Sequence, residues 1–404
     1  MITPVMPTYA RADLAFEKGE GPYLYAQDGR RFLDFGSGIA VNTLGHSHPH
    51  LVAKLSEQVG KLWHTSNLYQ MPGQVKLAER LVANTFADTV FFCNSGAEAN
   101  EAGIKMLRRY QHLSGNPEKN RILVATNAFH GRTLGTLTAG YSEKYREGFG
   151  PMPDGFDRVA FGNLNELRNA ITPNTGGIIL EPIQGEGGIC RAPEGYLEGV
   201  RKAADEFGML VMFDEVQTGI GRTGKLFAYQ WSDMVPDIIS SAKGLGGGFP
   251  IGALLANEKA ASAFSPGMHG TTFGGNQLAT AAANATSGLA STSYVNSTVS
   301  TATNGLASTS YVNNTVSTAT NGLASASYVN STVSSATSGL ATTAYADSAA
   351  ATAAANATSG LASTTDLNNA VSGLASTGYV DSRVSPLGSS IEEGEIVQNS
   401  LDDS

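Results

Sequence analysis

The chain has 404 residues, a formal net charge of −9 at pH 7, and hydrophobic residues at 41% of its positions. Its length allows two or more domains, and its negative charge argues against a nucleic-acid-binding or polybasic membrane surface. The N-terminus lacks the basic start and apolar core of a signal peptide, and no apolar run approaches the roughly 18 residues of a membrane span, so we expect a cytoplasmic protein without a nucleic-acid or membrane partner.

The first predicted elements are a hairpin and two helices. Residues 22–35 predict the hairpin, because Asp28-Gly29 is a turn signal between two apolar runs. Apolar residues at helical spacing predict helices over 49–62 and 74–86.

Two sets of side chains are of a type that could bind a metal or form a disulfide. Three histidines alternate in one short stretch: His46, His48 and His50. Pro49 interrupts their spacing and no cysteine or acidic residue stands beside them, so we predict no metal site. The two cysteines, Cys93 and Cys190, are far apart and follow apolar runs. We expect both to be buried free thiols of a reducing compartment.

A strand, a run of small residues and a helix follow one another at residues 89–110. The strand is predicted over 89–93, and the helix begins after Ser95, Gly96 and Ala97. This order directs backbone N–H groups at an anion. Taken alone, Ser95 could equally be an ordinary helix cap.

The next strand, predicted over 121–126, leads to Phe129 and Arg132. The planar guanidinium of Arg132 suits a substrate carboxylate, although a surface ion pair is the alternative. Phe129 could be a core residue. A further strand over 177–180 ends at Glu181, and a helix is predicted over 196–207.

Two later strands deliver a carboxylate and a lysine. The run at 209–213 ends at Asp214, and the run at 238–239 leads to Lys243 on a glycine-rich turn. Ligands of open α/β sheets bind beyond the carboxyl ends of the strands, so a shared site is indicated. Pyridoxal phosphate (PLP) needs a Schiff-base lysine and an acidic partner for its pyridine nitrogen. The alternative is that Asp214 caps a turn and Lys243 lies in solvent.

Six motifs extend this pattern into a family resemblance. They are FFCNSGAEANEAGIK (91–105), AFHGRTLGTLT (128–138), LEPIQGEGG (180–188), FDEVQTGIGRTG (213–224), SAKGLGGGFP (241–250) and HGTTFGGN (269–276). In this order they resemble the class III PLP-dependent aminotransferases, and within them the branch that acts on acetylornithine, succinylornithine and ornithine. The resemblance reaches from near the N-terminus to about Asn276.

The resemblance implies a fold and a set of roles. The fold would be the α/β fold type I of PLP-dependent transferases, with a mostly parallel sheet covered by helices on both faces. Residues 1–50 would be the N-terminal segment of a small domain, and 51–276 the PLP-binding large domain. The cofactor-binding residues would be Ser95, Gly96, Ala97, Phe129, Asp214, Gln217, Lys243 and Thr272, of which Lys243 is catalytic and Thr272 reaches the phosphate of a neighbouring subunit. The substrate-binding residues would be Arg132, Glu181 and Glu186.

The remaining sequence departs from that family. Residues 277–387 form Ser/Thr/Ala/Gly-rich repeats, with Leu289, Leu306 and their counterparts seventeen residues apart, and 388–404 form an acidic tail. The repeats resemble the trimeric shafts of phage tail fibres, and disorder is the alternative. Glu186 would then lack the arginine that the family's C-terminal segment supplies.

Two functions are open to a chain that joins an aminotransferase-like part to a repeat tail. The first is PLP-dependent transamination of N-acetylornithine with 2-oxoglutarate, for arginine biosynthesis, by a homodimer. We expect slow turnover, because one wall of the substrate cleft comes from the missing segment of a truncated small domain. The alternative is a structural, fibre-like or chimeric protein that carries a non-catalytic aminotransferase remnant.

Overall fold

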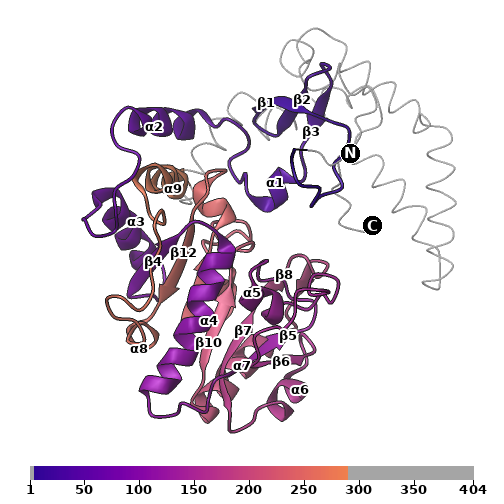
Figure 1. Ribbon diagram of the computed structural model, residues 1–404, viewed down its shortest axis with the longest axis vertical. Coiled ribbons are helices and arrows are strands. Elements are labelled where there is room, and N and C mark those ends of the chain that lie inside the picture. The colour runs from indigo at the N-terminus through magenta and orange to yellow at the C-terminus, as the bar shows by residue number, and fades with distance from the viewer. Residues whose placement is uncertain (1–3, 290–404) are drawn as a thin grey trace, which may run out of the picture. The chain divides into compact units, whose positions relative to one another are not determined.

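The computed structural model describes residues 4–289 (Figure 1). The predicted repeats after Leu289, the acidic tail and the fibre-like trimer lie outside the described residues. No described helix is long and apolar enough to cross a membrane.

The N-terminal part is a small antiparallel sheet. Its elements are β1 (Phe16–Glu20), β2 (Tyr23–Ala26) and β3 (Arg31–Leu33), followed by the short helix α1 (Ser37–Ala40). The predicted hairpin is confirmed, with Gly29 in its turn at a φ of +90°. Strand β1 was not predicted, because its sequence FEKGE has no apolar run. Beyond this small sheet, His46 Nε2 lies 2.7 Å from Asp34 Oδ2, a partner that the sequence spacing did not reveal.

A seven-stranded sheet forms the centre of the fold (Figure 1). In spatial order its strands are β4 (Thr89–Cys93), β12 (Gly252–Ala256), β11 (Ile238–Ser241), β10 (Leu210–Asp214), β7 (Thr175–Leu180), β5 (Arg121–Ala125) and β6 (Phe156–Val159). Strand β12 pairs antiparallel with both neighbours, and the other pairings are parallel. The mostly parallel α/β fold that the sequence predicts is confirmed.

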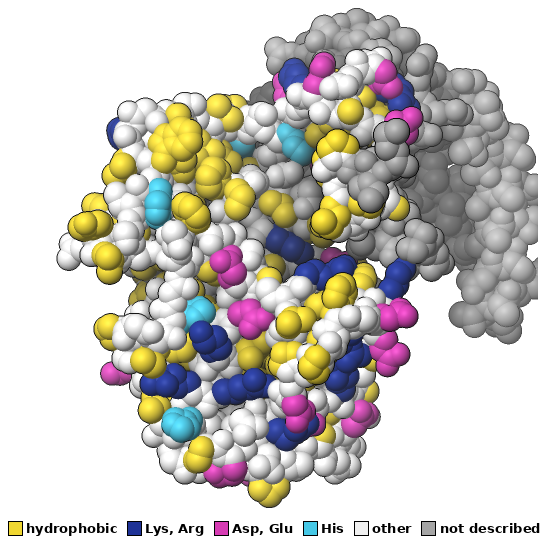
Figure 2. All heavy atoms as spheres, in the orientation of Figure 1, with side chains coloured by type: hydrophobic (Ala, Val, Ile, Leu, Met, Phe, Trp, Pro, Cys, Tyr) yellow, Lys and Arg dark blue, Asp and Glu magenta, His cyan; other side chains and the backbone are white. Residues whose placement is uncertain are grey.

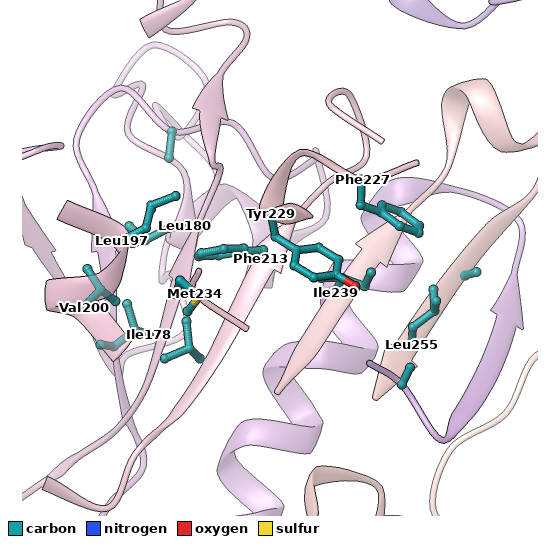
Figure 3. Close-up of a cluster of buried hydrophobic side chains, with 14 of the residues drawn as sticks. Ile178, Leu180, Leu197, Val200, Phe213, Phe227, Tyr229, Met234, Ile239 and Leu255 are labelled. Carbon is teal, nitrogen blue, oxygen red and sulfur yellow. The ribbon is translucent and has the colours of Figure 1, made fainter. Parts of the chain in front are cut away.

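Helices cover both faces of this sheet. Along β10, Val211 and Phe213 enter one core cluster while Leu210 and Met212 enter the other, because successive strand side chains point to opposite faces. The first face is covered by α3 (Pro72–Ala83), α6 (Leu164–Asn169), α7 (Tyr196–Phe207) and α9 (Gln277–Leu289); the second by α4 (Gly96–Leu113), α5 (Leu134–Ala139) and α8 (Glu258–Ala261). Figure 3 shows the first face, where Leu197 and Val200 of α7 lie beside β7.

The remaining elements are a helix that packs on α9, a two-stranded pair and two 3-10 helices. They are α2 (Pro49–Val59), the two-stranded pair β8 (Ile183–Gln184) and β9 (Cys190–Arg191), and the 3-10 helices η1 (Ala228–Trp231) and η2 (Lys243–Gly246). Cys93 is buried, but Cys190 is exposed, so the prediction for Cys190 was wrong. The β8–β9 pair carries it away from the core, and the preceding Ile189 is itself 74% exposed.

Helix α9 begins where the sequence predicted the repeats to begin. Asn276 caps it, accepting a hydrogen bond from Ala279 N at 2.9 Å. Ala282 and Ala283 are fully buried, and Arg80 of α3 donates to the Asn284 carbonyl at 2.8 Å. The globular fold therefore continues beyond Asn276. Alanine-rich composition suggested low complexity there, whereas the small side chains allow α9 to pack closely on the neighbouring helices.

Candidate active site

Five strands end at one edge of the sheet and deliver polar or aromatic residues to a common cavity. After β4 come Ser95, Gly96 and Ala97; after β5, Phe129, His130 and Arg132; after β7, Glu181 and Glu186; at the end of β10, Asp214, followed by Gln217; and after β11, Lys243. All of them line a cavity of about 440 Å³. The carboxyl edge of the parallel strands thus gathers the predicted site residues with one exception, Thr272. That residue lines a separate hollow beside Asn94 and Glu98.

Helix α4 points its N-terminus at this cavity. Ser95 is the helix cap: its Oγ accepts from Glu98 N at 3.2 Å and donates to Glu98 Oε2 at 2.9 Å. The N–H groups of the first turn, at Gly96 and Ala97, have no partner within the helix and are suited to an anion. A side chain at Gly96 would lie 2.7 Å from a methyl group of Val216, so this close approach requires glycine.

Asp214 is buried and held by three hydrogen-bond donors. Oδ2 accepts from Asn100 Nδ2 and His130 Nδ1, both at 2.7 Å, and Oδ1 accepts from Val216 N at 3.0 Å, while Ser240 Oγ lies 3.4 Å from Oδ1. Burial opposes ionisation, but the hydrogen bond and charge of His130 outweigh it and lower the pKa of Asp214. Burial likewise opposes a charge on His130, and the Asp214 carboxylate raises the pKa of His130. Asp214 is therefore a carboxylate rather than a carboxylic acid.

The sequence identified Asp214 but not its supports. Asn100 follows one turn after the cap of α4, its Oδ1 accepts from Ser240 Oγ at 2.6 Å, and its amide also bonds the His130 carbonyl. These side chains come from three separate elements, so no local spacing signals them. A buried imidazole nitrogen, His130 Nε2, has no hydrogen-bond partner among the described residues.

Lys243 opens η2 in the left-handed region, at a φ of +41°, which few residues other than glycine adopt. Burial lowers the pKa of Lys243, and the nearby charges of Glu186, Asp214 and Glu181 oppose that shift. A lowered pKa increases the fraction of neutral amine, the form that attacks a carbonyl carbon and accepts a proton.

Glu181, Glu186 and Gln217 line another wall of the cavity. Glu181 accepts hydrogen bonds from the backbone N–H groups of Phe129 at 3.1 Å and Gly185 at 3.3 Å. Burial raises the pKa of Glu181 to about 7. One Glu181 oxygen is thus committed to the backbone of Phe129 and the other to that of Gly185. Glu186 Oε1 accepts from Gln217 Nε2 at 3.4 Å, so these two side chains lie together at the mouth.

Arg132 is an exposed cation on the rim. Its guanidinium carbon lies 3.5 Å from the ring centroid of Tyr145 and 5.7 Å from that of Phe129. Within residues 4–289 it forms no ion pair, so its N–H groups remain available to an acidic ligand. Among the same residues, no group of three His, Cys, Asp or Glu side chains is placed to hold a metal ion.

The donor set of the cavity fits PLP. A buried carboxylate matches a protonated pyridine nitrogen, a lysine of lowered pKa matches an aldehyde, and the start of an 18-residue helix matches a phosphate. Together with the sheet, whose ligand site lies beyond the strand ends, these features define the class of PLP-dependent transferases of fold type I.

Comparison with known proteins narrows that class. The model of the family "Aminotransferase class-III" matches residues 6–309. The chain is 60% identical over 284 residues to acetylornithine aminotransferase of Brucella melitensis, covering 70% of each chain. It is 58% identical over 278 residues to the enzyme of the same name from Mesorhizobium japonicum, covering 69% of this chain and 70% of that one.

Two solved structures agree with this assignment. N-acetylornithine aminotransferase from Stenotrophomonas maltophilia K279a superposes with a TM-score of 0.61 at 40% identity, covering 74% of each chain. Ornithine aminotransferase from Toxoplasma gondii ME49 superposes with a TM-score of 0.69 at 30% identity, covering 71% of this chain and 69% of that chain. The chain belongs to the class III aminotransferases, and its cofactor is PLP.

Proposed function

We propose that this chain transfers the amino group of N-acetylornithine to 2-oxoglutarate. The observation that carries the proposal is the convergence of Lys243, Asp214 and the N-terminus of α4 on one cavity. The choice of donor is supported by the two relatives above, both named acetylornithine aminotransferase. An ω-amine donor of this kind carries a carboxylate at its far end, which Arg132 would bind with its planar fork.

Each residue has a distinct role in this proposal. When bound, PLP supplies an electron sink for the carbon that loses its proton. Lys243 would hold the cofactor and then, as general base and acid, take the proton from the amine-bearing carbon of the substrate and deliver it to the aldehyde carbon of the cofactor. Asp214 would hold a proton at the pyridine nitrogen, and the amides of Gly96 and Ala97 would bind the phosphate. Phe129 would cover one face of the ring, and Gln217 would bond its hydroxyl.

We also propose a homodimer in which Thr272 completes the site of a second copy. The segment that carries Thr272 is hydrogen-bonded to the loop between α2 and α3: Asn67 Nδ2 donates to the Thr271 carbonyl at 3.1 Å. Around Asn67, Leu68 is 89% and Tyr69 69% exposed. Figure 2 shows further hydrophobic side chains on the surface near α2 and α3. A second copy that buried these side chains would also meet Thr272.

The proposal extends to domain organisation and rate. Residues 1–50 would belong to a small domain, and 51–276, extended by α9, to the PLP-binding large domain. The matched relatives extend over a further part of their own length, about 30% for the Brucella protein, that this chain does not align with. If that part supplies a cleft wall, turnover here should be slow, because displacing a substrate by about 1 Å can cost on the order of a hundredfold in rate.

The test is spectroscopic and kinetic. Purified protein with PLP should show a visible absorption band that differs from that of free PLP and that sodium borohydride abolishes. Lys243→Ala should lack this band, while Lys259→Ala, which changes an exposed lysine of α8, should keep it. N-acetylornithine should then lower the absorbance of this band faster than ornithine does. A wild-type spectrum identical to that of free PLP would overturn the proposed function.

A further inference from the structure

Arg132 is held between two aromatic rings on the rim of the cavity. Its guanidinium carbon is 3.5 Å from the centroid of Tyr145, and the Tyr145 and Phe129 rings meet edge to face, with centroids 6.5 Å apart and an interplanar angle of 86°. One face of the guanidinium is therefore covered by Tyr145, whose ring also contacts the side chain proposed to cover the cofactor.

Two hydrogen bonds hold the backbone around Tyr145. Its backbone N–H donates to the Ser142 carbonyl at 3.3 Å, and the next residue, Arg146, donates to the Tyr141 carbonyl at 3.3 Å. Tyr145 lines a second cavity of about 370 Å³, which shares Phe129, Gly131 and Glu186 with the first. The half-buried ring thus forms part of a wall that continues from the site.

A ring stacked on a guanidinium restrains it without using its hydrogen-bond donors. The five N–H groups lie in the guanidinium plane, so a ring on its face leaves the fork available to a carboxylate. Cation–π attraction also limits the rotamers of a long side chain, which reduces the entropy lost when a ligand binds.

We propose that Tyr145 is a positioning residue that orients Arg132 for the carboxylate of the substrate. This inference rests on the proposed function, in which Arg132 binds that carboxylate. Tyr145 acts through its ring and through Arg132, and its hydroxyl is not required.

The test measures binding of glutarate, a dicarboxylate that cannot react, to the full chain with PLP by calorimetry. Arg132→Ala should weaken glutarate binding by at least about tenfold, the loss expected for hydrogen bonds between charged groups. Tyr145→Leu should weaken it by roughly two- to five-fold, the value of an exposed cation–π contact. Tyr145→Phe should bind like the wild type. In an Arg132→Ala background, Tyr145→Leu should have no further effect.

A matched control separates this role from general packing. Tyr110→Leu removes a cation–π contact with Lys259 in the last turn of α4, away from the site, and should leave glutarate affinity unchanged. In steady-state assays, Tyr145→Leu should raise the KM for 2-oxoglutarate while kcat changes little.

Several results would overturn the inference: no glutarate binding by the wild type, wild-type affinity in Tyr145→Leu, or an equal loss from Tyr145→Leu when Arg132 is absent. A wild-type protein that binds glutarate but transfers no amino group would instead overturn the proposed function. The glutarate affinities of the variants would still decide the role of Tyr145.

Discussion

Gly131→Ala should disturb both the fold and the cofactor site. Gly131 lies between β5 and α5 at a φ of +136°, a region that L side chains rarely adopt. An added Cβ would lie 2.7 Å from the Cβ of Ala97 and 2.7 Å from Thr136 Oγ1. Carbon atoms settle at about 3.5–4.0 Å, so Ala97 would have to retreat by roughly 0.8 Å. That residue belongs to the first turn of α4, which is proposed to bind the phosphate.

The magnitude combines two costs. Backbone strain contributes about 1–3 kcal/mol and overpacking about the same, so the free energy of unfolding should fall by about 2–6 kcal/mol. Displacing an amide that binds phosphate should also weaken PLP binding by roughly tenfold or more. Urea unfolding of the cofactor-free chain measures the first effect, and an absorbance titration with PLP measures the second.

Gly29→Ala is the matched control for strain. Gly29 also has a positive φ, +90°, but a Cβ there would meet no atom within 4 Å. It should lose about 1–2 kcal/mol of stability from strain alone and keep its affinity for PLP. If Gly131→Ala bound PLP as tightly as this control does, the proposed phosphate site at the start of α4 would be wrong.

Two further predictions concern the core. Burial raises the pKa of Glu215 from its usual 4.5 to about 7, so folding favours the protonated side chain. The stability that protonated Glu215 contributes is fully present below pH 4.5 and is lost as the pH rises through 7. Between pH 5 and pH 8 the wild type should therefore lose about 2–3 kcal/mol more than Glu215→Gln in urea unfolding, and parallel pH profiles would contradict this. On α9, Ala282→Leu should cost about 1–3 kcal/mol by overpacking, whereas Ala281→Leu, at a partly exposed position, should change stability by less than about 0.5 kcal/mol. Equal unfolding midpoints for the two variants would mean that α9 does not pack as described.

Much of the fold could be predicted from the sequence, because its parallel strands are buried on both faces. Such strands appear as short continuous apolar runs, and the run before Asp214 is fully buried in β10. Elements without that signal were missed or displaced. Strand β1 is mostly charged, and α9 is alanine-rich, so both depend on tertiary contacts that no local pattern records.

The site residues also divide into those that the sequence could predict and those that it could not. Asp214 and Lys243 could be predicted because each follows an apolar run that ends at the ligand-binding edge of the sheet. Ser240 and Asn100 could not, since their importance comes from meeting across 140 residues of sequence. Tyr145 lies in a loop of ordinary composition. Its contacts with Arg132 and Phe129, which only the folded structure shows, distinguish it from a surface tyrosine.

The adjacent residues Asp214 and Glu215 show how the environment gives the same functional group, a carboxyl group, two different roles. Both are buried, yet His130 and Asn100 bond Asp214 and lower its pKa, while Glu215 meets only neutral donors. Glu215 accepts from Thr218 Oγ1 and from the backbone N–H groups of Ala228 and Tyr229, at 2.7–2.8 Å, and burial raises its pKa. A charge is therefore kept at the cavity, where a cation can meet it. The second carboxyl group fastens η1 to the end of β10 and so fixes the chain between them, which carries Gln217.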